Sequence, residues 1–321
     1  MSTNFLQNLE ILKYPRTPHM EGSRLQAGDE GYEHVPYSRI AGRYGVLEEK
    51  IDAANSAESF SPGGELLLQS RGHYLMGGGS ERQFGLYKRW AAAHEDRLLS
   101  VLEDRYVMYG EWAHKKHSIF YDNLPAYFNE FDIWDRSREV FLDTEQRHQL
   151  LSGVPVLPVP VLYRGILPPR LEDLFELVRQ AWRPDTLWPN ELMPGKPKKR
   201  SAGQAPNLAD RLFHSLGKTP RWRENFENTV NQAGYDLQKC WSQADQSDKL
   251  EGLYIKIEEN GEVVERYKWV RADFVQSILD SKVHHAKQPF IPNGLAPGVD
   301  IFAPELSLRW EDLGLKTVEG F

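Results

Sequence analysis

The sequence predicts an α+β fold in which one strand-rich domain is interrupted by a helical insertion. Residues 41–170 carry aromatic and β-branched runs that are typical of strands, residues 171–247 change to apolar residues at helical spacing, and residues 248–285 return to strands. We therefore expect residues 1–170 together with 248–285 to form one domain and residues 171–247 to form a helical insertion or accessory subdomain. The Pro- and Gly-rich residues 286–321 are expected to pack on the surface as a C-terminal tail.

Turn and strand signals alternate through the first part of the chain. Residues 1–40 are polar with scattered Gly and Pro, which indicates irregular structure that caps the core. Two apolar runs flank Ser61-Pro62-Gly63-Gly64, which is typical of a hairpin turn. The strands expected here cover residues 44–50, 56–60, 65–70, 106–112 and part of 119–134.

Helical periodicity follows at several places. Apolar residues at spacings of three and four predict one helix over about 84–103, and Gly153 ends a short helix that begins near Asp143. Asn260-Gly261 predicts a tight hairpin turn between late strands at 252–258 and 262–270. The other expected helices cover residues 171–178, 208–216, 224–241 and 272–282.

Composition and charge exclude several classes of protein. The chain has 321 residues, of which 40% are hydrophobic and 26% charged, so it is not a disordered chain. The longest apolar stretch, 150–167, is broken by three prolines and Arg164, so no membrane partner is expected. The N-terminus lacks a secretory pattern and Cys240 is the sole cysteine, which favours the cytoplasm. A net charge of −7 argues against a surface coated in basic residues but allows a local basic groove.

The first segment that could carry chemistry is Glu49-Lys50-Ile51-Asp52-Ala53-Ala54-Asn55, where an expected strand meets a loop of small residues. If the segment is extended, Lys50 and Asp52 share one face. They are either a nucleophilic lysine with an acidic partner and a nearby amide, or a solvated surface pair. Lys-x-Asp occurs often enough by chance that this segment alone favours the surface pair.

Five later segments change that balance, because each adds a charged or aromatic group in or beside an expected strand. They are Ser70-Arg71-Gly72, Tyr109-Gly110-Glu111-Trp112, Phe128-Asn129-Glu130-Phe131-Asp132-Ile133, Glu251-Gly252-Leu253-Tyr254-Ile255-Lys256 and Arg266-Tyr267-Lys268. The order of all six resembles that of the covalent nucleotidyltransferases, which include DNA ligases, RNA ligases and mRNA capping enzymes. Six short matches in the right order are more specific than any one of them, and together they span about two thirds of the chain.

Two residues depart from the pattern of that family. Glycine usually follows the acidic residue of the first segment, and this chain has Ala53, which restricts the backbone. Arg266 stands where lysine is usual, and its planar fork differs from a movable point charge. The presence of Ala53 is expected to affect catalytic efficiency more than the assignment to the family.

The resemblance implies a nucleotidyltransferase domain that is ATP-grasp-like, with antiparallel sheets and flanking helices. DNA ligases and capping enzymes add an OB-fold after the last motif, whereas the residues that follow Lys268 look like one helix and an irregular tail. The segment around Lys50 and the Phe-Asp-Ile segment look most like the nick-sealing branch of the RNA ligases. We therefore expect an ATP-dependent RNA ligase without an OB-fold.

The resemblance implies a reaction in three steps. Lys50 attacks the α-phosphorus of ATP and becomes a lysyl-adenylate, AMP moves to a 5′-phosphate end, and a 3′-hydroxyl then displaces AMP and seals the strand. Because a protonated lysine is a poor nucleophile, nearby cations or a metal are expected to lower the pKa of Lys50.

The roles of individual residues also come from the resemblance. The resemblance implies five catalytic residues: Lys50, Arg71, Glu111, Glu251 and Lys268. The same five, together with Glu49, Asn55, Phe131, Lys256 and Arg266, are expected to bind the nucleotide, with Phe131 stacked on adenine. Asp52, Glu111 and Glu251 are the expected ligands of Mg²⁺ (or Mn²⁺), through water.

The expected partner is RNA with a 5′-phosphate and a 3′-hydroxyl end, nicked or broken, in RNA repair. An end-healing kinase or phosphatase is a candidate protein partner. Two alternatives stay open. One is a DNA ligase or capping-type nucleotidyltransferase, and the other, kept open by Ala53, is a degenerate domain that binds nucleotides or RNA ends without chemistry.

Overall fold

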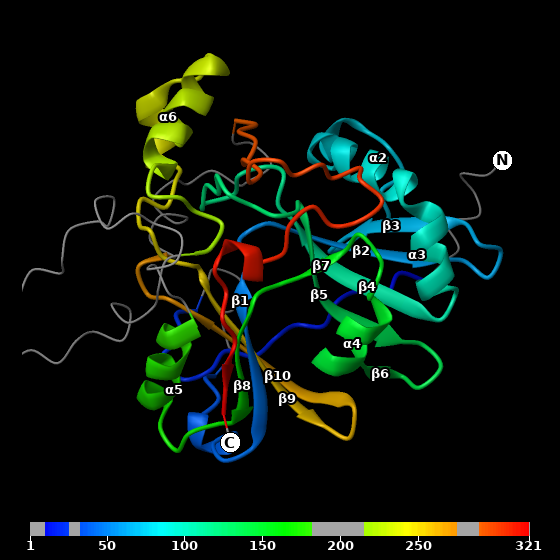
Figure 1. Ribbon diagram of the computed structural model, residues 1–321, viewed down its shortest axis with the longest axis vertical. Helices are drawn as coiled ribbons and strands as arrows, with labels where there is room; N and C mark the ends of the chain where they lie inside the picture. The colour runs from blue at the N-terminus through cyan, green and yellow to red at the C-terminus, as the bar shows by residue number, and fades with distance from the viewer. Residues whose placement is uncertain (1–9, 26–32, 182–214, 275–288, 321) are drawn as a thin grey trace, which may run out of the picture.

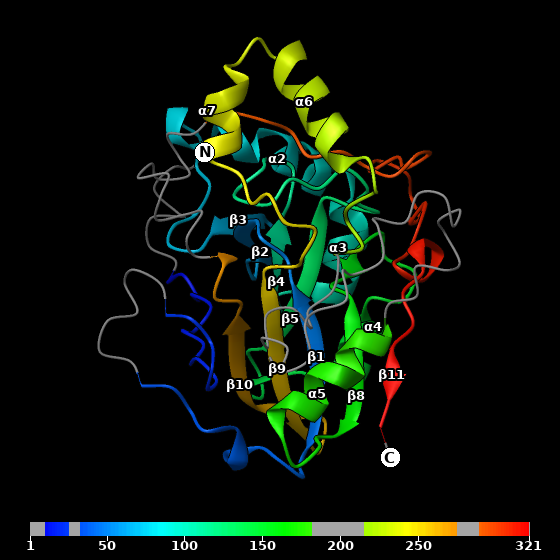
Figure 2. The ribbon, with the colours of Figure 1, turned by 90° about the vertical axis from the view of Figure 1, so that its left-hand side faces the viewer.

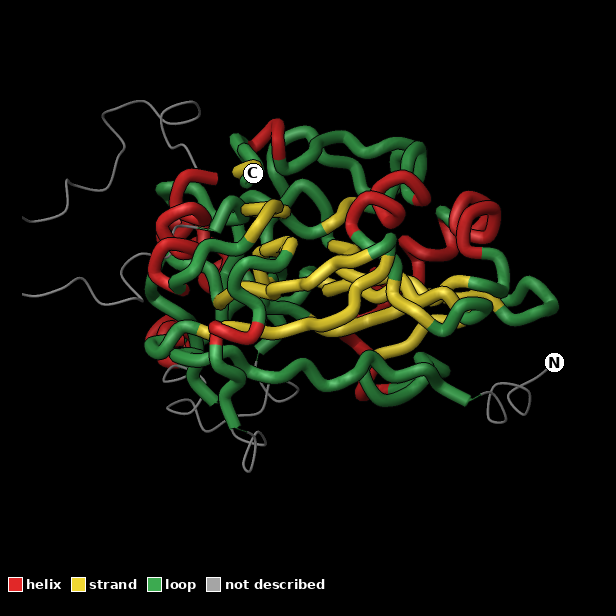
Figure 3. Tube along the Cα trace, turned by 90° about the horizontal axis from the view of Figure 1, so that it is seen from below, coloured by secondary structure: helices red, strands yellow, loops and turns green. Residues whose placement is uncertain are grey.

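Two β-sheets occupy the middle of the molecule, and helices and loops surround them (Figure 1; Figure 3). They are seen in a computed structural model of the chain, which describes residues 10–25, 33–181, 215–274 and 289–320. Antiparallel pairing dominates both sheets. The predicted mixture of antiparallel sheets and flanking helices is therefore confirmed.

The first sheet has five strands in the order β10-β9-β1-β8-β11. Its central strand, β1 (Tyr44–Lys50), pairs antiparallel with β8 on one side and with β9 on the other. Asn260 and Gly261 both have positive φ between β9 and β10, so the predicted tight hairpin is confirmed. The other strands are β8 (Val161–Ile166), β9 (Gly252–Glu259), β10 (Glu262–Val270) and β11 (Val318–Glu319), of which β11 runs parallel to β8.

The second sheet has the order β3-β2-β4-β5-β6, with β7 beside β5. The hairpin predicted around the Ser-Pro-Gly-Gly turn is confirmed by the antiparallel pairing of β2 with β3. Of the expected strand region 119–134, only the part from Phe128 is a strand, and the preceding residues form a loop. The strands are β2 (Ala54–Phe60), β3 (Leu66–Ser70), β4 (Tyr106–Trp112), β5 (Phe128–Asp135), β6 (Val140–Phe141) and β7 (Leu157–Pro158).

Two predicted helices are each divided in the structure. The helix expected over 84–103 is a 3-10 turn followed by α2 and α3, which meet at His94, where ψ is 9° instead of helical. The helix expected over 224–241 is divided into α6 and α7, because Gly234 adopts a left-handed φ of 69° between them. The α-helices are α2 (Gly85–Ala93), α3 (Glu95–Leu102), α4 (Thr144–Leu150), α5 (Leu171–Val178), α6 (Trp222–Gln232) and α7 (Leu237–Ser242). The 3-10 helices are η1 (Tyr37–Arg39), η2 (Gly79–Phe84), η3 (Arg179–Ala181) and η8 (Glu311–Leu313).

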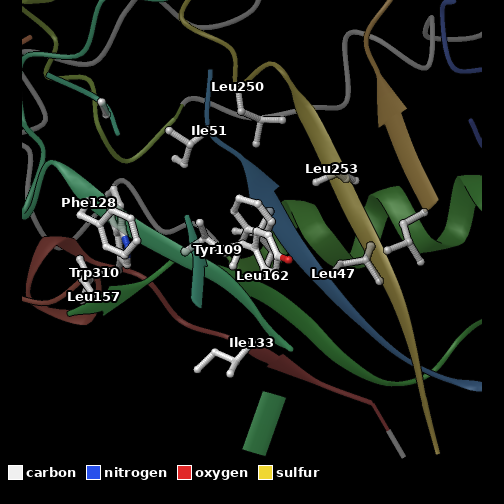
Figure 4. Close-up of a cluster of buried hydrophobic side chains, with 14 of the residues drawn as sticks. Leu47, Ile51, Tyr109, Phe128, Ile133, Leu157, Leu162, Leu250, Leu253 and Trp310 are labelled. Atoms are coloured by element: carbon white, nitrogen blue, oxygen red, sulfur yellow. The ribbon is translucent and has the colours of Figure 1, made fainter. Parts of the chain in front are cut away.

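One large apolar core joins the two sheets. Leu47 and Leu253 come from the first sheet, Tyr109 and Ile133 from the second, and Trp310 from the C-terminal segment (Figure 4). Each of these side chains is at most 2% exposed. Burial of this kind stabilises the pairing of the sheets by removing apolar surface from water.

The predicted helical insertion is described in two parts. Helix α5 forms at its expected place and packs on the first sheet, where the rings of Phe175 and Trp269 lie 4.8 Å apart. Helices α6 and α7 share a smaller apolar cluster with Phe120 and Ile291, and they lie at the end of the molecule away from the C-terminus (Figure 1; Figure 2).

Two expected helices cannot be compared with the structure. The helix expected at 208–216 lies outside the described residues up to residue 214. The helix expected at 272–282 lies outside them beyond residue 274. None of the described helices is long and apolar enough to span a membrane.

Candidate active site

One face of the first sheet gathers several of the predicted site residues. Lys50 ends β1, and because side chains alternate along a strand, Glu48 points to the same face as Lys50. Across the sheet, Glu48 lies opposite Tyr254, and Tyr254 lies opposite Lys268. The same register places four of the predicted residues on this face: Lys50, Lys256, Arg266 and Lys268.

The second sheet contributes a carboxylate and an amide beside this face. Asn55 of β2 and Glu111 of β4 are direct register partners, so their side chains share one face of that sheet. Burial raises the pKa of Glu111 well above its ordinary value, and the charges of Lys50 and Arg71 offset only part of that rise. Arg71 follows β3 and is exposed, so it lies at the rim of the site. Asn55, Arg71 and Lys50 thus all lie near Glu111.

A β-bulge determines which β5 side chains reach the site. The pairing of β4 with β5 shifts register next to Gly110. A bulge redirects side chains, and here two consecutive residues contact the same face of the first sheet. Phe131 stacks on Tyr254, and Asp132 lies 3.1 Å from Lys256 Nζ. Without the bulge, one of them would point away from the site.

Lys50 and Glu251 form the central ion pair of the site. Lys50 Nζ lies 2.7 Å from Glu251 Oε1, and the lysine side chain is only 16% exposed. Burial by itself lowers the pKa of Lys50, but the charge of Glu251 outweighs it, with help from Tyr254 and Glu111, so the pKa lies above its ordinary value. Burial raises the pKa of Glu251 to about 7, against the opposing effect of Lys50. The expectation that neighbouring cations lower the pKa of Lys50 is therefore wrong, because the charged group beside it is the anion of Glu251.

Two aromatic rings form parallel walls beside Lys50. The rings of Phe131 and Tyr254 are 6.1 Å apart and 15° from parallel. Lys50 Nζ lies 5.8 Å from the centre of the Tyr254 ring. Two rings in this near-parallel arrangement offer flat apolar surfaces on which an aromatic base can stack. Tyr14 closes the far side, with its ring edge-on to Phe131 at 5.0 Å.

Lys256 lies in a buried ionic network below these rings. It is 1% exposed, and its Nζ lies 2.7 Å from Glu48 Oε2 and donates to the backbone oxygen of Phe131. Arg266 lies 3.7 Å from Asp132 and its guanidinium stacks over the ring of Phe141. Two carboxylates, Glu48 and Asp132, thus surround the ammonium group of Lys256.

Asp52 is placed differently from the expectation of a shared face with Lys50. The strand ends at Lys50, so Asp52 falls in the following loop. Its Oδ2 accepts hydrogen bonds from the backbone N–H groups of Ser118 and Ile119, both at 2.7 Å. This oxygen anchors the loop between β4 and β5.

Glu49, which the resemblance implies binds the nucleotide, does not share a face of β1 with Lys50. It is 1% exposed and points to the face of β1 opposite Lys50, where Ser215 and Lys218 are its neighbours. Burial raises its pKa to about 7, although the hydrogen bond from Ser215 and the charge of Lys218 lower it. Its side chain is therefore separated from the nucleophile by the sheet itself.

The carboxylates beside Lys50 suit a hydrated metal ion better than a directly bound one. Among the described residues, no group of three or more His, Cys, Asp or Glu side chains is arranged to hold a metal. Glu111 Oε2 and Glu251 Oε2 are nevertheless buried without a hydrogen-bond partner in the described part of the chain. Mg²⁺ keeps several waters and binds through one or two carboxylates, so these two oxygens fit water-mediated binding.

Comparison with known proteins identifies the family. A sequence model described as RNA ligase matches residues 43–270, which is more than two thirds of the chain and includes all six motifs. The chain belongs to the RNA ligase family. No curated protein matches its sequence. The family assignment made from the motifs is thus confirmed.

Solved structures of Naegleria gruberi RNA ligase resemble this family member at low identity. A variant with AMP and Mn has a TM-score of 0.47 at 15% identity, covering 84% of this chain and 59% of that chain. The same ligase with PPi has a TM-score of 0.44 at 16% identity, covering 87% and 63%. This chain therefore spans about three fifths of the length of those ligases.

The motifs did not predict five residues of the site. These residues differ in whether a signal in the sequence could have revealed them. Tyr254 stands midway between Gly252 and Lys256, so the period of two along a strand could have revealed it. The others, Tyr14, Glu48, Asp132 and Arg147, enter through contacts between segments that are distant in the sequence.

Proposed function

We propose that this chain is an ATP-dependent RNA ligase that acts through a lysyl-adenylate on Lys50. The observation that carries the proposal is the position of Lys50 Nζ, 2.7 Å from Glu251 and beside the paired rings of Phe131 and Tyr254. A nucleophile, a base and a slot for a flat ring thus lie together inside the region that matches the RNA ligase family. Solved structures of Naegleria gruberi RNA ligase hold ATP with Mn, AMP with Mn, or PPi, which is consistent with ATP as the proposed substrate.

Formation of the adenylate requires Lys50 to lose a proton. Glu251 Oε1 is within hydrogen-bond distance, and its pKa of about 7 makes it a base suited to neutral pH. Once water is excluded by bound ATP, transfer of the proton gives a neutral pair, which a buried site tolerates better than two charges. The lone pair of Nζ then forms a bond to the α-phosphorus as the bond to the bridging oxygen breaks, and pyrophosphate leaves with the electron pair.

Cations at the edges of the site suit the charge that develops on the phosphoryl oxygens. Lys268 lies on the same face of the first sheet as Lys50, and Arg71 lies at the rim near Glu111. Arg266 is held under the rings by Asp132 and Phe141, so we assign it to the floor of the nucleotide pocket. Asn55 shares a face with Glu111 and is suited to a phosphate or ribose contact.

Glu111 and Glu251 would hold Mg²⁺ or Mn²⁺ through water. When bound, such an ion neutralises negative charge on the nucleotide phosphates. Asp52, which was expected to join them, instead fixes the loop after β4 through Ser118 and Ile119. The proposed metal site therefore has two carboxylates.

The later steps follow from the same chemistry. The adenylate passes to a 5′-phosphate end of RNA, which restores Lys50, and a 3′-hydroxyl then attacks that phosphorus and releases AMP. Broken or nicked RNA is the proposed substrate, which makes RNA repair the proposed role, with an end-healing kinase or phosphatase as the partner that prepares such ends. Comparison of ribose with deoxyribose at the 3′ end distinguishes this from a DNA ligase.

The decisive test is transfer of label from α-labelled ATP to the protein. Wild-type protein with Mg²⁺ should retain the label after denaturation in detergent at neutral or alkaline pH, where the P–N bond of a lysyl-adenylate is stable, and GTP, CTP and UTP should transfer little. Lys50→Ala should abolish the transfer, whereas Lys239→Ala, which changes an exposed lysine on α7, should leave it unchanged. ATP binding by folded wild-type protein without any label would contradict a catalytic role and favour a nucleotide-binding domain.

A further inference from the structure

Arg147 is the most deeply buried cation outside the predicted motifs. Its side chain is 0% exposed, and it projects from α4 into the space between the two sheets. A charge buried to this extent is found in proteins only with partners, and Arg147 has two. Nε and Nη2 donate to the two carboxylate oxygens of Glu130 at 2.8 and 3.1 Å, and Nη1 donates to Glu48 at 3.0 Å.

The two partners of Arg147 come from different walls of the nucleotide pocket. Glu48 lies on β1, two residues before Lys50 and on the same face. Glu130 lies on β5, directly before Phe131. One guanidinium therefore connects the strand that carries the nucleophile to the strand that carries the stacking ring.

We propose that Arg147 is a positioning residue that sets the spacing between Lys50 and Phe131 in the nucleotide pocket. The fork of a guanidinium has a fixed geometry, so it holds two carboxylates at a defined separation, which a lysine ammonium does not. The separation matters because the ring centroids of Phe131 and Tyr254 are 6.1 Å apart, and a base stacked on both rings would have to lie between them. The assignment rests on the proposed function, since it gives Arg147 a role in nucleotide binding and adenylate formation.

A purely structural role is the alternative to be excluded. Arg147 belongs to a network in which three carboxylates, Glu48, Glu130 and Asp132, face three cations, Arg147, Lys256 and Arg266. Removing one charge from such a balanced set leaves another buried without a partner, which destabilises a protein whatever its activity. An informative variant must therefore keep the buried charges balanced while it removes the bidentate contact of the guanidinium with Glu130.

Two variants meet that condition. Arg147→Lys keeps the cation but loses the bidentate contact, and Arg147→Met combined with Glu130→Gln removes one cation and one anion together. Arg221→Met is the matched control, since it removes an arginine from an exposed ion pair with Glu224 at the start of α6. Thermal unfolding, adenylylation kinetics with labelled ATP and the Kd of ATP are measured for each protein.

We expect both variants to unfold cooperatively, with Tm close to that of the control, yet to bind ATP at least about tenfold more weakly. Their kcat/KM for adenylylation should fall by about 100-fold, as expected when reacting groups are misplaced by about 1 Å. Wild-type KM and kcat/KM in the charge-balanced double variant, or losses that simply follow Tm, would overturn the positioning role.

The outcome also distinguishes this role from the proposed function. If wild-type protein binds ATP but takes up no label, the ligase function fails while the ratio of Kd values still decides the role of Arg147. Equal Kd values for wild type and both variants would then overturn the positioning role. Wild-type protein that neither binds ATP nor takes up label would overturn both.

Discussion

Tyr254 lies beside both Lys50, the proposed nucleophile, and Phe131, the proposed stacking ring. Its ring is parallel to Phe131 and close to Lys50 Nζ, and burial raises the pKa of its hydroxyl to about 12. The phenol therefore stays neutral at physiological pH, and the ring acts as an uncharged stacking surface. Such a surface supplies affinity for a base without adding a second anion beside Glu251.

Removing the Tyr254 ring should weaken ATP binding. Stacking of a base on an aromatic side chain is worth about 1–3 kcal/mol, so Tyr254→Ala should raise the KM of ATP in the adenylylation assay by about tenfold. Tyr254→Phe keeps the ring and should stay within about twofold of the wild type. Equal KM values for all three proteins would show that the base binds elsewhere.

Helix α4 carries Arg147, the residue proposed to set the spacing of the nucleotide pocket. It is short, and Asp143 Oδ1 accepts the backbone N–H of Gln146 at 2.8 Å at its start. Isolated helices of this length are unstable, so the cap and the hydrogen bonds that Thr144 donates to Glu258 help to hold it in place. A weaker cap would loosen the element that carries Arg147.

Loss of the α4 cap should be measurable as lost stability. Asp143→Ala should lower the free energy of unfolding by about 1 kcal/mol in urea, while Asp143→Asn should retain most of it. Glu145→Ala, at an 80% exposed side chain of the same helix, is the control and should change it by less than about 0.5 kcal/mol. An equal loss in both alanine variants would mean that the cap does not stabilise α4.

The elements that were predicted correctly have local signals. Asp143 and Gly153 bound α4, and Asn260-Gly261 supplies the two positive φ values that the late hairpin requires. His94 gave no such signal, because the apolar spacing of the region continues across it although the backbone there is not helical. Periodicity reports which residues are buried, and it does not report whether one helix or two bury them.

At the scale of the whole molecule, the site could be predicted only as far as its motifs reach. The alternation of side chains along β1 is enough to predict that Lys50 and Glu48 share one face. The bulge beside Gly110, which lets the consecutive residues Phe131 and Asp132 both contact the first sheet, depends on how β4 pairs with β5. Tyr14 hydrogen-bonds to Asp132 across 118 residues of sequence. Such contacts are fixed by tertiary packing, which a single sequence does not display.

The fold also buries several carboxylic acids, and this gives stability a characteristic dependence on pH. Burial raises the pKa of Glu58 from 4.5 to about 8, with the Tyr87 hydroxyl beside it, and the side chain is 0% exposed. Between these two values the folded chain keeps a proton that the unfolded chain has released. The free energy of unfolding must then fall as pH rises, by up to about 1.4 kcal/mol per pH unit for this one group.

Glu58→Gln isolates this effect, because glutamine does not titrate and matches the shape of the protonated acid. The difference in the free energy of unfolding between Glu58→Gln and wild type should grow steadily in favour of the variant from pH 5 to pH 8. The amide can also change the free energy of unfolding by an amount that is the same at every pH. This does not affect the test, because the change of the difference with pH is the quantity measured. Glu145→Gln, at an exposed carboxylate, should give a difference that does not change with pH over this range. A flat difference for Glu58→Gln as well would mean that Glu58 is already ionised in the folded protein, and that the packing around β2 tolerates a buried charge.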